Sequence, residues 1–155
     1  MERKTKVTAA EGKQDLLITR EFDLPLELLF RAHAEPELVA QWMGTKVLKL
    51  ENRKHGSWQF ETFDPQGKVV FKANGVFHDV VPNERITRTF EMENAAFGVQ
   101  LEFLEFERLT DDTSKLTMHV VYESGELRDQ MLKLPFEYGI NIAHARLQEM
   151  IGKLK

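Results

Sequence analysis

The sequence predicts an α+β fold in which one curved antiparallel sheet wraps around a long C-terminal helix. Three observations predict it: an amphipathic stretch at the C-terminal end, a run of short strand-like segments from Lys46 to Tyr122, and two short helical segments after the first strand-like segment. With 155 residues and no repeat or linker, the chain is expected to form a single domain over residues 1–155.

Residues 135–155 have the pattern of a single amphipathic helix. Pro135 suits the start of a helix, because its missing N–H group would have no partner in the first turn. Gly139 is predicted to face the sheet and carries no side chain, so it would leave space there. Apolar residues recur at steps of three and four, on one face: Phe136, Ile140, Ala143, Leu147, Met150 or Ile151, and Leu154. The pattern predicts a helix that lies across a sheet, with an apolar cavity between the two.

The N-terminal part of the chain predicts one strand followed by two short helices. Apolar and polar residues alternate over 16–22, and Arg20 falls in the inward row, where it needs a carboxylate or carbonyl partner. One helix is expected over about 25–33, since Pro25 suits a first turn. A second is expected over about 35–43, and Gly44 ends it.

Turn residues recur about every eight to twelve positions between Lys46 and Tyr122, as an antiparallel meander requires. Six strands are expected, over roughly 46–53, 56–63, 68–78, 84–93, 98–109 and 114–122, which makes about seven with the first. A short helical or loop segment over 126–134 leads into the last helix.

Side-chain alternation assigns an inner face rich in aromatic residues. In the strand over 98–109 the apolar phase changes between Phe103 and Leu104, so Leu101 and Phe103 are assigned to the inner face and a bulge is expected. The other residues assigned to this face are Leu48, Leu50, Trp58, Phe60, Phe71, Phe77, Ile86, Phe90, Leu116, Met118 and Val120.

Composition and charge exclude several functions. The net charge of -4 offers no attraction to phosphates, so nucleic acid is not expected as a partner. Residues 1–14 lack the apolar run of a signal peptide, and no eighteen consecutive residues are apolar, so we expect a cytoplasmic protein without membrane insertion. The chain has no cysteine, and its five histidines lack the two-on-a-helix spacing of a zinc site. No metal, cofactor or catalytic residue is expected.

Several short motifs occur along the chain in an order that is typical of a known family. They are Arg20-Glu-Phe-Asp-Leu-Pro25, Phe30-Arg-Ala32, Glu35-Pro-Glu37, Gln41-Trp42, Arg53-Lys-His-Gly56-Ser-Trp58, Asp64-Pro-Gln-Gly67, Gly75-Val-Phe77, Pro82-Asn-Glu84-Arg85-Ile86, Glu137-Tyr-Gly139 and Arg146-Leu147. Their order and spacing resemble the START-like (SRPBCC) superfamily, in the branch of activator of heat-shock-chaperone ATPase homologues.

The resemblance implies a helix-grip fold, with a cavity between sheet and helix that holds hydrophobic or amphipathic molecules in many relatives. The chain departs from the family pattern at Met43, Thr45, His55 and Ile140, and these changes reshape the pocket mouth. The residues expected to line the cavity are His33, Trp42, Met43, Trp58, Phe60, Phe71, Phe77, Arg88, Phe90, Leu101, Phe103, Met118, Tyr122, Phe136, Gly139, Ile140, Ala143 and Leu147.

The polar candidates in this cavity each have a structural alternative. Arg88 is in phase with the apolar inner row, where an unpaired guanidinium would be costly. It could bind a ligand carboxylate, or it could form an ion pair with Glu102 or Glu105. Tyr122 and Tyr138 could offer hydroxyl groups to a ligand.

Two further groups of residues also have two interpretations each. Trp42, Met43 and His33 could close one end of the cavity as a lid, or Trp42 could be core and His33 a surface residue. The acidic cluster that begins at Glu102 includes Glu105 and Glu107. Such a cluster could serve glycosidic chemistry, but it fits better as the exposed row of a strand.

The favoured function is therefore binding of a small hydrophobic or amphipathic molecule, without catalysis. The alternatives are a polyketide cyclase or aromatase-like enzyme, in which Arg88 or a tyrosine would hold an enolate oxygen, and a co-chaperone that binds a chaperone ATPase. A monomer or a homodimer is expected, because an exposed edge strand could pair with a second copy.

Overall fold

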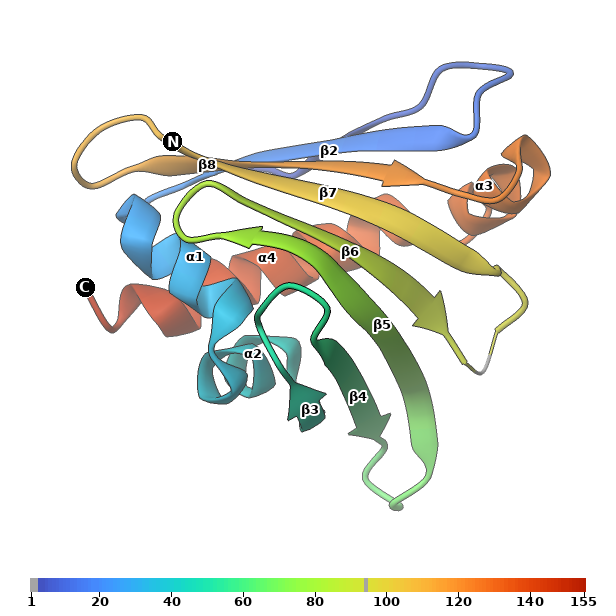
Figure 1. Cartoon of the computed structure of the whole chain (residues 1–155), viewed down its shortest axis with the longest axis horizontal. Coiled ribbons are helices and arrows are strands. Elements are labelled where there is room, and N and C mark those ends of the chain that lie inside the picture. The colour runs from blue at the N-terminus through green and yellow to red at the C-terminus, as the bar shows by residue number, and fades with distance from the viewer. Residues whose placement is uncertain (1–2, 94) are drawn as a thin grey trace.

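The computed structural model describes residues 3–93 and 95–155, and these form one eight-stranded antiparallel sheet and four helices (Figure 1). The strands are β1 (Lys6–Thr8), β2 (Asp15–Phe22), β3 (Lys46–Leu50), β4 (Ser57–Phe63), β5 (Val69–Val81), β6 (Arg85–Met92), β7 (Val99–Arg108) and β8 (Ser114–Val121). The helices are α1 (Leu26–Ala34), α2 (Pro36–Met43), α3 (Gly125–Leu132) and α4 (Phe136–Gly152). The predicted α+β fold, with a curved sheet, a long C-terminal helix and two short helices ahead of β3, is confirmed.

The strand order across the sheet is β1-β2-β8-β7-β6-β5-β4-β3, with antiparallel neighbours throughout. Strand β1 was not predicted, because three residues are too few to show alternation. It pairs with β2, Val7 lying opposite Ile18, and so forms one edge of the sheet. The predicted count of about seven strands was therefore one short.

Helix α4 runs along one side of the curved sheet, with α1 and α2 at one end and α3 at the other (Figure 1). Its buried face consists of His144, Leu147 and Ile151, with Ile140 and Ala143 half-buried. The spacing of three and four placed all of these residues except His144 on one face in the sequence. Helix α4 therefore covers the sheet as predicted.

Helices α1 and α2 are joined by side-chain packing and by one hydrogen bond. The Trp42 indole Nε1 donates to the carbonyl oxygen of Ala32 at 2.8 Å, which fixes α2 against α1. Helix α2 ends at Gly44, whose φ of 61° lies in the left-handed region that glycine adopts without strain. The tandem helices thus pack as one unit against the end of the sheet and α4.

The predicted bulge in β7 is wrong. Strand β7 pairs with β8 in continuous register from Leu101 opposite Val121 to Arg108 opposite Ser114. Its buried row is Gln100, Glu102, Leu104 and Phe106, so Leu101 and Phe103 lie on the outer face of the sheet. The prediction failed because the two polar members of the inward row have polar partners inside the protein, which a pattern of hydrophobicity does not reveal.

Register shifts occur instead between β3 and β4, between β4 and β5, and between β5 and β6. The first lies between Val47 and Lys49, and it leaves Leu48 45% exposed while Val47 packs against the core. The assignment of Leu48 to the inner face is therefore wrong, since a bulge reverses the side-chain alternation that the assignment assumed.

No helix in the described part of the chain is long and apolar enough to cross a membrane.

Candidate ligand-binding site

The structure divides the predicted lining residues into four groups. Those fully buried in the core are His33, Trp42, Trp58, Phe60, Phe77, Met118, Tyr122 and Leu147. Those half-buried at the inner face or on the helices are Met43, Phe71, Arg88, Phe90, Phe136, Ile140 and Ala143. Gly139 is exposed, and Leu101 and Phe103 lie on the outer face. The predicted lining residues therefore do not share one environment, since some are buried in the core and others are half-buried or exposed.

Most of the half-buried residues are apolar side chains of the inner face and of α4 that are only partly covered. Phe90 points inward from β6, with its ring centroid 5.4 Å from that of Trp58 and 6.4 Å from that of Phe71. A Cβ atom at Gly139 would have no neighbouring atom within 4 Å, so the flank of α4 is open there. Solvent therefore reaches part of Phe71 and Phe90 on the inner face, and it reaches α4 at Gly139.

Gly139 is nevertheless more exposed than expected. At a spacing of 3.6 residues per turn, it falls at the edge of the stripe that contains Ile140 and Leu147, rather than in its centre. The open space beside Gly139 consequently lies at the exposed flank of α4.

The main polar feature of the inner face is an ion pair. The Arg88 guanidinium Nε donates to Glu102 Oε1 at 2.8 Å, and the two side chains are 14% and 5% exposed. Gln100 Nε2 donates to the other carboxylate oxygen of Glu102 at 2.9 Å. Of the alternatives left open for Arg88, the structure shows the ion pair with Glu102. Arg85, not Arg88, lies opposite Glu105.

Glu102 is therefore not part of the exposed acidic row in which it was predicted to lie. It points into the protein and is buried, whereas Glu105 and Glu107 are exposed on the other side of β7. The signal that could have identified it is its register opposite Arg88, since a buried charge requires a partner of opposite sign.

Tyr122 lies beside this ion pair at the end of β8. It is 2% exposed, and its hydroxyl has no hydrogen-bond partner among the residues that the structure describes. Burial, and then the negative charge of Glu102, raise the pKa of the Tyr122 phenol, so it remains neutral and can donate its proton in a hydrogen bond. We call Arg88, Gln100, Glu102 and Tyr122 the inner polar cluster. Tyr138 does not join it, because its side chain is on an exposed part of α4.

Two buried histidines lie on the helices, His33 on α1 and His144 on α4. His33 Nδ1 is 3.0 Å from the Leu29 carbonyl oxygen, and burial lowers the pKa of His33 to about 4. His144 Nδ1 is 2.7 Å from Thr5 Oγ1, and burial lowers the pKa of His144 to about 3. Both imidazoles are therefore neutral near pH 7. Trp42 packs against both of them.

This arrangement places Trp42 and His33 in the core. The surface position considered for His33 is wrong, because its ring packs between Trp42 and Phe106. Sequence reasoning did not identify His144, although it follows Ile140 by four residues and therefore shares its side of α4.

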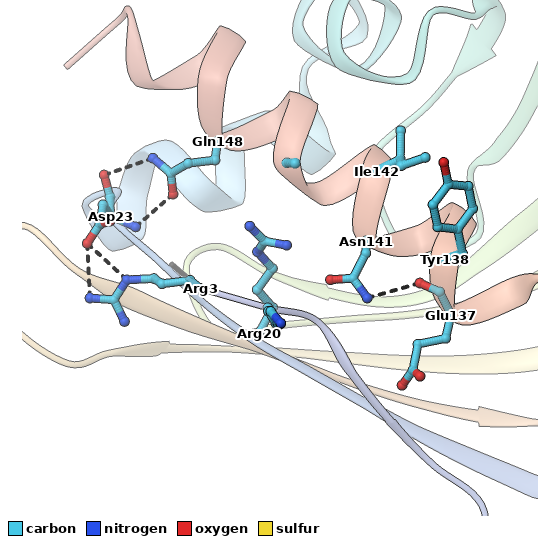
Figure 2. A pocket seen from close by; sticks show the side chains of 10 residues that line it. Arg3, Arg20, Asp23, Glu137, Tyr138, Asn141, Ile142 and Gln148 are labelled. Carbon is cyan, nitrogen blue, oxygen red and sulfur yellow. Dashed lines mark hydrogen bonds and ion pairs between the residues drawn. The ribbon is translucent and has the colours of Figure 1, made fainter. Parts of the chain in front are cut away.

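A separate groove of about 680 Å³ lies between the other side of α4 and the N-terminal segment (Figure 2). It is lined by Arg3, Lys4, Arg20, Asp23, Glu137, Tyr138, Asn141, Ile142, Ala145 and Gln148. Its polar groups largely bind one another. Asn141 Oδ1 accepts from the Thr5 amide at 2.8 Å and Asn141 Nδ2 donates to the Thr5 carbonyl at 3.1 Å. The groove therefore includes contacts that hold the N-terminal segment on α4, and it was missed because β1 was not predicted.

Arg20 reaches the boundary between this groove and the buried histidines. Its Nη1 donates to Thr5 Oγ1 at 3.3 Å, and its guanidinium lies 5.3 Å from the centroid of the Phe22 ring. The prediction that Arg20 points inward from β2 is consistent with its 7% exposure.

Comparison with known proteins supports the same fold over nearly the whole chain. A protein from Rhodobacter sphaeroides has a solved structure with a TM-score of 0.86 at 20% identity, covering 97% of this chain and 99% of that one. A protein from Arthrobacter aurescens gives 0.84 at 16% identity, with 96% and 91% covered. CalU16 from Micromonospora echinospora gives 0.63 at 20% identity, with 97% and 73% covered. At identities of 20% or less, these structural matches show a shared fold and no more.

No curated protein matches the chain. The family described as "Activator of Hsp90 ATPase homolog 1-like protein" matches residues 23–152, which run from the residue after β2 to the end of α4. That match spans most of the sequence and agrees with the START-like resemblance of the motifs. The chain therefore belongs to the family of activator of Hsp90 ATPase homolog 1-like proteins.

Proposed function

We propose that this chain is a cytosolic protein that binds a small hydrophobic or amphipathic molecule between the sheet and the first half of α4. The observation that carries the proposal is the half-burial of apolar side chains that point toward the interior. Phe71, Phe90 and Met92 do so from the sheet, and Phe136 and Ile140 lie on α4. In a protein with a closed core, side chains in such positions would be fully covered.

A ligand in this space would gain mainly from covering apolar surface. Covering on the order of 200 Å² of apolar surface contributes ~5 kcal/mol at ~25 cal/mol per Å². Association and ordering cost a comparable amount, so apolar contact alone supports weak binding. A tighter complex requires a polar contact at a defined point, as in most small-molecule sites.

The first experiment is native mass spectrometry of the protein purified from its own host. We expect a co-purifying small molecule whose mass is lost on denaturation. The site is then tested with a pair of variants on α4. Ala143 is half-buried and packs against the core, whereas Ala145 is exposed.

Ala143→Phe is expected to fill the space and reduce the amount of co-purified molecule at least tenfold, and Ala145→Phe is expected to leave it unchanged. Thermal unfolding of both variants separates loss of binding from loss of folding. Equal retention of the molecule by both variants would contradict binding at this position.

A second candidate function is an enzyme of the polyketide cyclase kind. The observation that favours it is the inner polar cluster, whose Arg88 and Tyr122 could both donate to a developing enolate oxygen. The test returns the co-purified molecule to the protein in excess and follows its mass over time. Recovery of the unchanged molecule would support binding alone.

The family description favours a third candidate function, binding to a chaperone ATPase, and a pull-down with the host chaperone tests it.

A further inference from the structure

The inner polar cluster contains one positive and one negative side chain and therefore carries no net charge. We propose that this cluster is the polar end of the ligand site and that it selects a neutral carbonyl or hydroxyl oxygen over a carboxylate. The inference depends on the proposed function, because it names the class of molecule that the same space would take.

The cluster is positioned by the strand register. Arg88 on β6 lies opposite Glu102 on β7, which places both side chains on the inner face. Leu101 lies opposite Val121 at the end of β8, so the next residue, Tyr122, extends beside Gln100. Arg88 also precedes Phe90 by two residues in the same inward row. The cluster therefore shares the inner face of the sheet with the half-buried side chain of Phe90.

Two donors in the cluster are available to a ligand oxygen. The Arg88 Nε is bound to Glu102, whereas its two terminal nitrogens have no hydrogen-bond partner among the described residues. The Tyr122 hydroxyl is also unpartnered within the described part of the chain, at 2% exposure. A buried hydroxyl without a partner is unfavourable, and a ligand oxygen that bonds to it removes that penalty.

Glu102 determines which ligand charge the site accepts. Its carboxylate accepts from Arg88 on one oxygen and from Gln100 on the other, and its side chain is 5% exposed. A ligand carboxylate that approached Arg88 would lie close to this second negative charge in a poorly solvated site, where like charges repel strongly. A neutral oxygen accepts the same hydrogen bonds without that repulsion. The ion pair thus converts an arginine site from one for anions into one for neutral polar groups.

The test compares three probes that share a similar alkyl chain: 2-decanone, 1-decanol and decanoate. Binding is measured at pH 8, where decanoate is ionised, by isothermal titration calorimetry and by tryptophan fluorescence. Trp58 contributes to that signal together with Trp42, and the centroid of its ring lies 5.4 Å from the Arg88 guanidinium. We expect the wild-type protein to bind 2-decanone and 1-decanol at least tenfold more tightly than decanoate.

Two variants assign the selectivity to the cluster. Tyr122→Phe removes only the hydroxyl, so it should weaken 2-decanone and 1-decanol about tenfold and leave decanoate unchanged. Glu102→Gln removes the negative charge and keeps the shape, so it should strengthen decanoate at least tenfold. Tyr138→Phe removes an exposed hydroxyl from α4 and is the matched control, with no change expected for any probe.

The outcomes separate the two proposals. Binding of decanoate as tight as that of the neutral probes, or unchanged affinities in Tyr122→Phe, overturns the selectivity while the binding function stands. Failure of all three probes to bind, together with the absence of a co-purified molecule, overturns both. If Glu102→Gln does not fold, the comparison of Tyr122→Phe with Tyr138→Phe still decides whether the inner polar cluster binds the neutral oxygen.

Discussion

Replacing Glu102 with leucine is expected to destabilise the protein by about 3–5 kcal/mol, because it leaves the Arg88 guanidinium buried without its counter-charge. The two side chains are 14% and 5% exposed and are joined by a contact of 2.8 Å. At an effective dielectric constant of ~20, two unit charges ~4 Å apart attract by about 4 kcal/mol. The position of Arg88 over the Trp58 ring adds a smaller cation–π attraction, and the Glu102→Leu variant keeps it.

The assay is urea-induced unfolding of a double-mutant cycle that contains Glu102→Leu, Arg88→Met and the double variant. We expect both single variants to be destabilised, and the double variant to be within about 1 kcal/mol of the wild type. Replacement of a buried ion pair by apolar residues of similar size is often neutral, whereas removal of one partner is not. The coupling energy between the two sites should therefore exceed about 2 kcal/mol.

Two results would refute this reasoning. A loss below about 1 kcal/mol in Glu102→Leu would mean that solvent already screens Arg88, as it does for a surface pair. A double variant whose loss equals the sum of the single losses would mean that the two charges do not interact across β6 and β7. Either result would also weaken the charge argument for a neutral ligand.

Three further predictions concern stability. The pKa values of the two buried histidines are lowered in the folded state. The unfolded chain therefore binds more protons than the folded chain below about pH 6.5. Between pH 7.5 and pH 5, the free energy of unfolding should fall by about 2 kcal/mol for each histidine. Urea unfolding of His144→Leu at the two pH values should show roughly half of that histidine-dependent loss, and an unchanged loss would contradict the assignment. Asn141→Leu, which removes two hydrogen bonds to the N-terminal segment, should cost about 1–3 kcal/mol and speed amide exchange in β1, whereas Ile142→Ala at an exposed position should change neither. Leu104→Ala should cost about 2–5 kcal/mol by thermal unfolding and Leu101→Ala less than about 1 kcal/mol, and equal losses would show that the two faces of β7 are wrongly assigned.

Much of the fold was predictable because its signals are local. The spacing of Phe136, Ile140 and Leu147 identifies α4 within a single segment, and Gly44 marks the end of α2. Strand positions followed from turn residues that recur along the chain. Errors in the fold arose where the local pattern was too short, as in β1, or where a bulge reversed it, as at Leu48.

The candidate site was less predictable, because its chemistry depends on pairs of residues far apart in the sequence. The inward direction of Arg88 was readable from its own strand, but its partner is on β7, where Glu102 occupies a position that hydrophobicity assigns to solvent. His144 was overlooked for the same reason, since its partner Thr5 is 139 residues away.

The sequence by itself determined the order of helices and strands and the apolar face of α4, because hydrophobic periodicity and turn residues act within a few positions. The tertiary structure alone decided which polar side chains are buried and which partners they have. Burial of a charge is stable only when a complementary group arrives from another strand, so the identity of that group depends on strand register and not on any single segment.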